Sequence, residues 1–367
     1  MYFQNGLNAE SERYGHGIKF ISVKDILNND FITYEAIEGL VDATKKEQET
    51  FKVTYGDIVF QRSSEVPSDI GRSNTYLDNT PCLFGGFVIR GHKCGTYHPY
   101  FLKTALESPI NRKTIIRLGA GAQHYNIGQE SIRGAVINLP ALAEQEKIAV
   151  LFQSLNKRIA VQNKIIEELL TLKKALYNKV FGTDAFNCRD ISLHHFMKMP
   201  DSVREMHPDR HKLITVRLNE GGVIKNTNVE TLKMASTIYY RRSAGQFIYG
   251  KQNIFHGAFG IVPCHLDGYA SSGDVPALDF KEGVNSSFLM RSMSFSCYSW
   301  EKYASGTGSK RIHEKSLLEL QVRMPSSGFV ERLEKMFAAL EQRIERNRRT
   351  LNLYLTQKRY LLSQLFI

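Results

Sequence analysis

One long helix and its copy constrain the fold of this chain more than any other feature. Between Ala141 and Phe181 the apolar residues recur at steps of three, four and seven over about ten helical turns, at Ile148, Leu151, Leu155, Ile159, Ile166, Leu169, Leu172, Leu176 and Val180. The stripe is narrow, as in a coiled-coil seam. Pro140 stands just before the segment and Gly182 just after it, where proline and glycine favour helix ends. The spacing therefore predicts a single long helix over 141–182.

The same pattern returns 185 positions later, over residues 326–366. Without a gap, this offset matches Phe152 with Phe337, Leu155 with Leu340, Arg158-Ile159 with Arg343-Ile344, Leu170-Thr171 with Leu355-Thr356, and Phe181 with Phe366. It also matches Pro140 with Pro325, Ile127 with Ile312 and Gly121 with Gly306, so the register holds over about sixty residues. The chain is therefore two half-proteins in tandem, each a globular region followed by a long helix.

We expect an α+β protein with two mixed α/β regions that share a plan. In the first region, strands are predicted at 17–23, 56–60 and 84–89, and a short helix at 98–108. In the second, segments 212–218, 245–249 and 287–289 occupy the places of 18–23, 56–60 and 100–102. The first eight residues do not open with a complete element, and we suspect that an N-terminal strand is missing from this sequence.

The composition bounds the function only broadly. Of 367 residues 42% are apolar and 11% aromatic, which is typical of an ordered protein. The chain contains no run of eighteen apolar residues, so no membrane span is predicted, and the N-terminus has no signal-peptide pattern. The net charge of +11 fits a polyanion such as nucleic acid, and equally a basic solvated surface. Part of the excess lies on the two helical segments, so charge alone does not locate a DNA-binding face.

Cysteine usage indicates a reducing compartment, and we expect a cytoplasmic protein. The five cysteines are odd in number, widely spaced and without a C-x-x-C pair. Cys82, His92, Cys94 and His98 could be considered as zinc ligands, but their spacing matches no usual paired-ligand pattern. We therefore predict no metal site.

Three stretches carry a resemblance to a known family. They are the L-P-x-L-x-E-Q-x-K-I-A pattern at Leu139–Ala149; the turn and strand Gly56–Phe60, followed by Gln61–Ser64 and Ile70–Arg72; and Ala244–Tyr249, continuing into Gly257–Pro263. With these motifs and its half-repeat, the whole chain resembles the specificity subunit of type I restriction-modification systems. No single motif is decisive, but the combination is specific.

The resemblance implies two target-recognition domains, 1–140 and 183–325, and two helices, 141–182 and 326–367, that pack as an antiparallel coiled coil. Each domain would read one half of a split DNA sequence. The helices would set the spacing and dock two methyltransferase subunits. At about 1.5 Å per residue, forty residues span roughly 60 Å, enough for readers about one and a half to two duplex turns apart.

The partners implied by the resemblance are double-stranded DNA, methyltransferase subunits and a restriction (translocase and nuclease) subunit. S-adenosylmethionine and ATP would bind those partner subunits. The abrupt N-terminus and a second helix that is poorer in leucine depart from the family.

One pair of residues supports antiparallel packing. Gln162 interrupts the first apolar stripe near its midpoint, and Asn347 interrupts the second at the equivalent position. Antiparallel packing brings helix midpoints together, so the two amides would face each other and fix the register at some cost in stability. The alternative is two exposed polar residues on a solvent-facing turn.

No enzyme motif is evident. The chain lacks the [ND]-P-P-[FYW] signature of adenine methyltransferases, and Gly119–Gly121 and Phe84–Gly86 fit turns better than a cofactor loop. The segment Gly306–Lys310 lacks the full phosphate-loop spacing and matches Gly121–Tyr125 of the first half. The histidine pairs His194-His195 and His207/His211 have no catalytic context. We therefore predict a non-catalytic chain without a cofactor of its own.

DNA contacts are expected from polar, basic loops that follow strands, because Arg and Gln can pair with base edges while Ser and Arg hold phosphates. In the first domain the candidates are Gln61, Arg62, Ser63, Ser64, Ser68 and Arg72. In the second they are Arg241, Arg242, Lys251, Gln252, Asn253 and His256, with Lys310 and Arg311 as further phosphate ligands. Each could equally be an ordinary loop residue.

Two other functions stay open at this level. One is the specificity subunit of another restriction class, which serves a fused nuclease-methyltransferase. The other is an assembly scaffold in which the helices bind partners and the globular regions bind protein rather than DNA. The sequence does not separate these from the main interpretation, and it does not give the DNA target or the spacer length.

Overall fold

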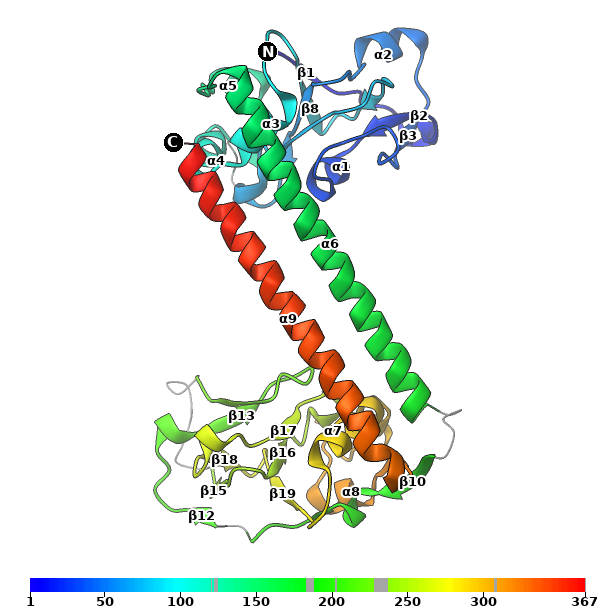
Figure 1. Cartoon of the computed structure of the whole chain (residues 1–367), viewed down its shortest axis with the longest axis vertical. Coiled ribbons are helices and arrows are strands. Elements are labelled where there is room, and N and C mark those ends of the chain that lie inside the picture. The colour runs from blue at the N-terminus through cyan, green and yellow to red at the C-terminus, as the bar shows by residue number, and fades with distance from the viewer. Residues whose placement is uncertain are drawn as a thin grey trace. The chain divides into compact units, whose positions relative to one another are not determined.

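The computed structural model describes residues 1–119, 121, 125–182, 188–201, 203–227, 237–306 and 309–366. It divides into two compact units, coloured along the chain in Figure 1. Unit 1 combines Met1–Ile166 with Arg346–Ile367, and unit 2 is Glu167–Glu345. Each unit therefore holds one mixed α/β globular region together with a segment of each long helix, and the predicted fold class is confirmed. The predicted four-part division of the chain stays a prediction, and the start of its third part lies outside the described residues.

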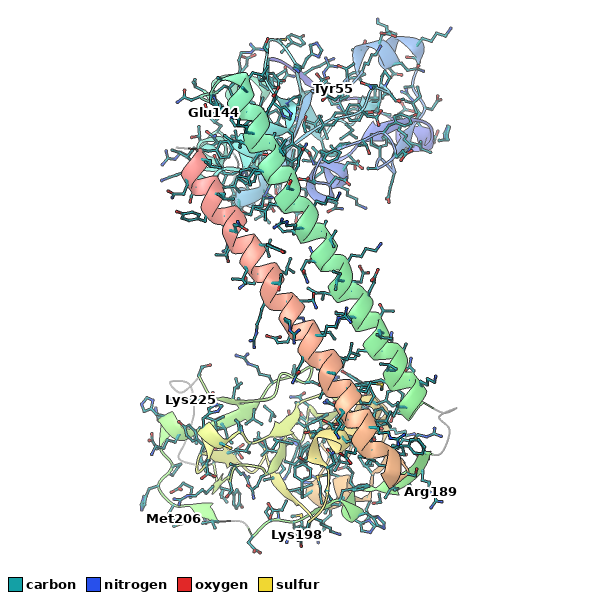
Figure 2. The ribbon with its side chains drawn as sticks, in the orientation of Figure 1. Tyr55, Glu144, Arg189, Lys198, Met206 and Lys225 are labelled. Carbon is teal, nitrogen blue, oxygen red and sulfur yellow. The ribbon has the colours of Figure 1, made fainter. Side chains whose placement is uncertain are left out.

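The two predicted long helices are α6 (Leu142–Phe181) and α9 (Ser327–Leu365). In unit 1, the Phe152 ring of α6 lies 6.0 Å from Phe366, which follows α9. In unit 2, Phe181 at the end of α6 stacks 6.1 Å from Phe337, in the first third of α9. The start of one helix thus meets the end of the other, so the helix segments pack antiparallel. Glu144 lies in the first turn of α6 (Figure 2), where a negative charge suits the helix dipole.

The buried face of α6 differs from the predicted stripe. Leu155 and Leu169 are buried, but Leu151 and Leu172 are 42% and 48% exposed. Phe152, outside the predicted stripe, is fully buried. In unit 1 α6 packs both on α9 and on a globular helix, so the buried face is wider than a two-helix seam and turned away from Leu151. The strict seam prediction was therefore wrong at these positions.

The globular region of unit 1 holds two main sheets. A four-stranded sheet has the order β1 (Tyr2–Asn5), β8 (Val88–His92), β4 (Ile58–Gln61) and β6 (Ser73–Thr75). A three-stranded sheet has the order β3 (Leu40–Val41), β2 (Tyr14–Ile21) and β7 (Leu83–Phe84). The short pair β5 (Ser63–Ser64) and β9 (Tyr125–Asn126) lies apart from both. The helices are α1 (Val23–Asn28), α2 (Lys45–Thr50), α3 (Pro99–Glu107), α4 (Pro109–Arg117) and α5 (Gln129–Arg133).

Two local features explain where elements begin and end in unit 1. The predicted strand over 84–89 is in fact two strands, because the main chain turns at Gly85, whose carbonyl accepts a 2.9 Å hydrogen bond from the amide of Val88. The predicted helix over 98–108 is confirmed as α3. Pro99 opens it, and the His98 ring caps it by accepting from the Phe101 amide at 3.3 Å.

The globular region of unit 2 is built from short strands. A four-stranded sheet has the order β11 (Met197–Lys198), β19 (Ala277–Phe280), β16 (Phe247–Tyr249) and β17 (Phe259–Ile261). A three-stranded sheet has the order β12 (Arg204–Glu205), β15 (Tyr239–Arg241) and β18 (Ala270–Ser272). Two further pairs are β13 (Ile214–Val216) with β14 (Val223–Lys225), and β10 (Cys188–Ser192) with β20 (Gln321–Pro325). Its helices are α7 (Ser286–Ser296) and α8 (Glu314–Glu319). The predicted strand over 212–218 shrinks to β13, because a 3₁₀ turn occupies Arg210–Lys212.

The cores join each globular region to its helix segments. In unit 1, Tyr100 and Phe101 of α3 pack with Phe152 of α6 and Leu362 of α9. In unit 2, Phe288 of α7 lies 5.4 Å from Phe181 of α6, in a cluster that also holds Phe337 of α9. The long helices are thus part of each core.

Candidate nucleic-acid interface

In unit 1 the predicted loop follows β4, and the structure separates its buried members from its exposed ones. Gln61 is only 5% exposed, and its amide donates to the Ser63 carbonyl at 2.9 Å. It therefore supports the turn instead of facing solvent, and its predicted DNA contact stays a prediction. Arg62 is half-buried and donates to the Gly86 carbonyl at 3.3 Å. Ser63 is tied to Asn126 of β9 by a 2.5 Å hydrogen bond between side chains.

The outer part of this loop carries the exposed candidates. Ser68 and Arg72 are exposed, and Ser64 is half-buried. The Arg72 guanidinium pairs with Asp69 at 3.2 Å, with about half of the arginine side chain in solvent. An exposed ion pair of this kind is worth only about 0–1 kcal/mol, so a phosphate could replace Asp69 as the partner of Arg72 at little cost.

Arg112 of α4, which the sequence did not single out, holds this loop in place. Its guanidinium donates to the carbonyls of Ser68 at 2.8 Å, Ile70 at 2.8 Å and Gly71 at 3.0 Å. Burial, with the nearby charge of Arg72, lowers its pKa to about 10, so it remains charged at neutral pH. The loop is therefore held through its backbone. This anchoring depends on a long-range contact with α4, which the local sequence of the loop does not show.

Gly71 allows the loop to pack closely on α4. Its φ is +62°, and an added Cβ would lie 2.4 Å from Cγ2 of Ile115. Both the backbone conformation and the space favour glycine here. The predicted loop is thus a tightly packed turn whose exposed side chains project from a rigid base.

In unit 2 the predicted residues also separate by burial. Arg242 is 3% exposed; its guanidinium donates to the Ser271 hydroxyl at 2.7 Å and to the Val275 carbonyl at 3.2 Å, and burial lowers its pKa to about 10. Arg242 therefore holds the local fold through Ser271 and Val275, and its predicted DNA contact stays a prediction. Its neighbour Arg241 is exposed and pairs with Glu205 at 2.8 Å.

The other predicted cations of unit 2 are also paired with carboxylates. Lys310 contacts Glu301 at 2.7 Å, Arg311 contacts Asp274 at 3.0 Å, and Lys251 contacts Glu314 at 3.2 Å. The Lys251 pair is largely buried, whereas the other two lie in solvent. Asn253 and His256 are exposed and Gln252 is half-buried. Phosphate binding by Lys310, Arg311 and Arg241 would require exchange of their carboxylate partners. Further exposed residues of this region, Met206 and Lys225, are labelled in Figure 2.

The two amides of the helix pair face each other. In unit 1, the Gln162 side chain of α6 donates to the Asn347 side chain of α9 at 2.5 Å. Gln162 is 8% exposed and Asn347 is half-buried. A hydrogen bond in an otherwise apolar seam favours one register over its neighbours, because any slip would leave a buried amide without its partner.

Two of the residues weighed as metal ligands, His92 and His98, have other contacts, and Cys82 is buried. The His92 ring lies 3.0 Å from Asp57, His98 caps α3, and burial raises the pKa of Cys82 to about 12. Among the described residues, no three His, Cys, Asp or Glu side chains gather as a metal site would require. No helix in the described ranges combines the length and apolarity of a membrane span. The glycine loops at 121–125 and 306–310 lie partly outside the described residues, at 122–124 and 307–308.

Comparison with known proteins gives sequence relatives of one kind. No protein-family model matches the chain. A Methanocaldococcus jannaschii protein assigned as the MjaX type I restriction enzyme specificity subunit is 22% identical over 232 residues, covering 62% of this chain and 54% of the relative. The EcoKI type I specificity subunit of Escherichia coli is 28% identical over 171 residues, covering 45% and 35%. The chain thus spans about half the length of the first relative and about a third of the second.

Solved structures match the fold over nearly the whole chain. The type I restriction-modification S subunit from M. genitalium has a TM-score of 0.62 at 16% identity, covering 100% of this chain and 93% of that one. A chain from a study of complex assembly in the type I restriction-modification system has a TM-score of 0.51 at 11% identity, covering 98% and 96%. Both structures support the tandem plan with two long helices. In sequence and in fold, this chain is similar to the specificity subunits of type I restriction-modification systems.

Proposed function

We propose that this chain is a sequence-specific DNA-binding subunit that reads a bipartite target and is itself non-catalytic. The observation that carries the proposal is the match to an S-subunit fold along the entire chain, together with sequence relatives that are all type I specificity subunits. The internal repeat adds support, because two globular regions on one helix pair suit a target with two halves.

The anchored loop of unit 1 would act as one reader. Arg72 would take a phosphate in exchange for Asp69, while Ser64 and Ser68 project from the base that Arg112 holds. In unit 2, Arg241, Lys310 and Arg311 would exchange their carboxylates in the same way. Because phosphate contacts release counterions, we expect affinity to fall steeply as salt rises. Charged loops of this kind position the protein, and base contacts add specificity.

The proposed partners are methyltransferase subunits, which this chain would bring to the target, and a restriction subunit. S-adenosylmethionine and ATP would bind those partners. One of the matching structures belongs to work on complex assembly in a type I restriction-modification system, which supports a role within a complex. The proposed docking surface is the long helices, whose exposed apolar residues include Val150 and Val161 on α6 and Leu353 and Tyr360 on α9.

Methylation mapping tests the proposal. The chain would be co-expressed with its cognate methyltransferase subunit in a host that lacks adenine methylation, and methyladenine would be mapped across the genome. We expect one split motif, two short specified halves around a fixed spacer. A folded complex that neither methylates nor binds DNA would overturn the proposal and favour an assembly scaffold. DNA binding without methylation would leave the recognition role and contradict delivery of the methyltransferase.

A further inference from the structure

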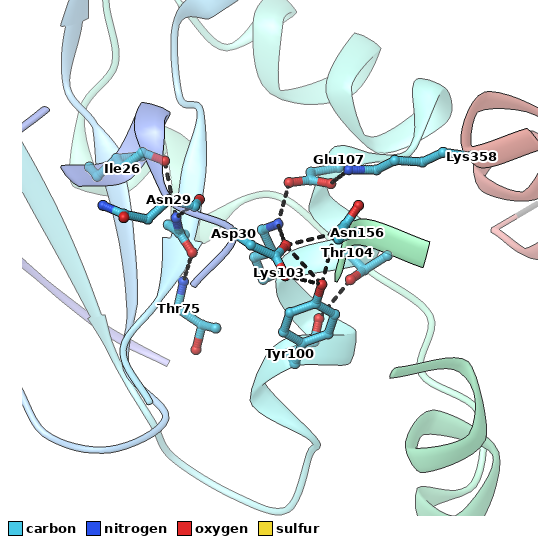
Figure 3. A network of polar contacts seen from close by, with 11 residues as sticks. Ile26, Asn29, Asp30, Thr75, Tyr100, Lys103, Thr104, Glu107, Asn156 and Lys358 are labelled. Carbon is cyan, nitrogen blue, oxygen red and sulfur yellow. Dashed lines mark hydrogen bonds and ion pairs between the residues drawn. The ribbon is translucent and has the colours of Figure 1, made fainter. Parts of the chain in front are cut away.

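A polar network connects the globular region of unit 1 to both long helices (Figure 3). We call it the anchoring network; its members are Asp30, Tyr100, Lys103, Glu107, Asn156 and Lys358. They come from the loop after α1, from α3, from α6 and from α9. All belong to unit 1, and the network lies beside the apolar contacts of Phe152 and Phe366.

The first part of the network ties Asp30 to α6. The Asn156 amide donates to the Asp30 carboxylate at 2.6 Å and to the Tyr100 hydroxyl at 2.8 Å. The Tyr100 hydroxyl in turn donates to the same carboxylate, 2.8 Å from either oxygen. Tyr100 is fully buried, and burial with the charge of Asp30 raises its pKa, so it remains a neutral donor. The three groups thus satisfy one another in a single geometry.

The second part ties α3 to α9. Lys103, which is 3% exposed, contacts Asp30 at 3.3 Å and Glu107 at 2.6 Å. Lys358 of α9 contacts the other oxygen of Glu107 at 3.4 Å. Burial alone would raise the pKa of Glu107, but the charges of Lys103 and Lys358 outweigh it and the pKa is lowered. Glu107 is therefore ionised at neutral pH and holds a cation from the globular region and one from the helix.

The network also reaches the candidate DNA loop. Asn74 of β6 donates from its side chain to the carbonyls of Ile26 at 3.1 Å and Asn29 at 2.8 Å, just before Asp30. Asn74 stands two residues after Arg72, and it is fully buried. A continuous set of hydrogen bonds and short chain segments therefore runs from the loop, through residues 29–30, to α6 and α9.

Unit 2 has polar contacts at the equivalent helix positions, with different chemistry. The repeat offset of 185 places Glu341 where unit 1 has Asn156, and Lys173 where unit 1 has Lys358. Glu341 accepts from Arg291 of α7 at 2.9 Å and pairs with Lys173 at 3.0 Å. Each unit thus joins its globular helix to both long helices by polar contacts at the same place, although the residues differ.

We infer that the Asp30–Asn156 and Glu107–Lys358 contacts are positioning contacts, which fix the first recognition region on the helix pair and thereby restrict the target to one spacer length. The inference rests on the proposed bipartite function. The physical basis of the inference is that hydrogen bonds are directional, whereas apolar contacts are not. Apolar side chains tolerate repacking with small shifts, whereas a hydrogen bond weakens steeply once its angle or length changes. Without the polar contacts, the Tyr100–Phe152 packing would remain, but the region could take several orientations.

The test measures spacer discrimination by the complete methyltransferase complex. Once the motif is mapped, duplexes would carry both half-sites with the mapped spacer, or with spacers one or two base pairs shorter or longer. For the unchanged chain we expect methylation of the altered spacers to be at least about tenfold slower, equivalent to about 1.4 kcal/mol. For Asn156→Ala with Lys358→Ala we expect this ratio to fall to about threefold or less. Duplexes with a mutated half-site should still be rejected by both chains.

Matched variants keep the test decisive. Lys157→Ala and Arg359→Ala alter exposed neighbours on the same two helices and should leave spacer discrimination unchanged. If the double variant does not fold, as judged by its thermal unfolding, Lys358→Ala alone serves, and Lys358→Arg should restore discrimination. Unchanged discrimination in a folded variant overturns the inference while the proposed function stands. A wild-type complex that neither binds nor methylates any duplex overturns the proposed function instead.

Discussion

At the residue scale, two arginines near one loop have separate roles. Arg72 lies largely in solvent and pairs weakly with Asp69, while Arg112 is half-buried and donates to three backbone carbonyls of the loop. One is therefore placed to contact a ligand, and the other to hold the loop that carries it. Substitutions of the two should separate binding from stability.

Arg72→Ala should weaken DNA binding at every sequence tested and reduce the slope of log affinity against log salt by about one, because one phosphate contact is lost. Fluorescence anisotropy at several salt concentrations measures both quantities. Arg133→Ala is the matched control, since Arg133 is equally exposed and also pairs with an acid three residues away. An equal loss in both variants would show that general charge, not the loop, accounts for the effect.

Arg112→Met should destabilise the folded chain by about 2–4 kcal/mol, because three loop carbonyls lose the donor that the half-buried guanidinium supplies. Chemical denaturation of the chain measures the loss. Lys113→Met, at the exposed neighbouring position, should change stability by less than about 0.5 kcal/mol. Similar stability for both variants would contradict the anchoring role of Arg112.

Residue type predicted the candidate loops but not which side chains face outward. Arg242 and Gln61 have suitable chemistry, yet both are buried by contacts with residues elsewhere, such as the Arg242 bond to Ser271. Arg112 has an ordinary place in the sequence of α4, and its role depends on carbonyls more than forty residues away. Such contacts leave no local pattern, so burial and partners had to come from the structure.

At the scale of elements, the Gln162–Asn347 hydrogen bond adds a polar contact to the apolar packing of the antiparallel helix pair. Replacing Gln162 alone with Leu leaves the Asn347 amide without this bond, and we expect a loss of about 1–3 kcal/mol. Replacing both with Leu should recover that loss or exceed the original stability, because a buried polar pair gives way to apolar packing. Thermal and chemical unfolding of Gln162→Leu, Asn347→Leu and the double variant form the measurement, and additive losses would exclude a direct interaction between the two amides.

The contact of α3 with α9 should depend on pH. The pKa of Glu107 is lowered in the folded state from its usual 4.5, so its ionised form stabilises the fold above about pH 4.5. That contribution is lost as the pH falls through the lower, folded pKa. Glu107→Gln should therefore unfold at a lower temperature than wild type at pH 7, with the difference shrinking as the pH drops below 4.5. A difference that stays constant with pH would point to packing instead of charge.

Elements with a long, repeated period were predicted well, and short ones less so. The helices α6 and α9 follow from a spacing that recurs twice in the chain. The single strand expected over 84–89 is broken at Gly85, a turn that apolar alternation does not reveal. The exposure of Leu151 also differs from prediction, because α3 adds a second packing partner to α6.

At the scale of the whole molecule, each unit carries its own globular region and its own polar contacts to the helices. Replacing residues 183–325 with the corresponding region of a related subunit should therefore change one half of the methylated motif and leave the other half and the spacer unchanged. Methylation mapping of the chimaera measures this directly. Changes in both halves would show that the two regions do not read independently. The tandem plan followed from the repeat, but the anchoring network did not, since Asp30, Asn156 and Lys358 are distant in sequence.

The hydrogen bonds from Arg112 to the loop have a consequence for how the loop can change in sequence. Arg112 holds main-chain carbonyls, which every amino acid possesses, and it makes no use of the side chains of Ser68 or Ile70 for those bonds. Substitutions at the exposed positions of the loop can therefore accumulate without removing the hydrogen bonds from Arg112 to its backbone. Under the proposed DNA-reading function, a lineage carrying this loop can change its base preference one substitution at a time while the loop backbone stays ordered.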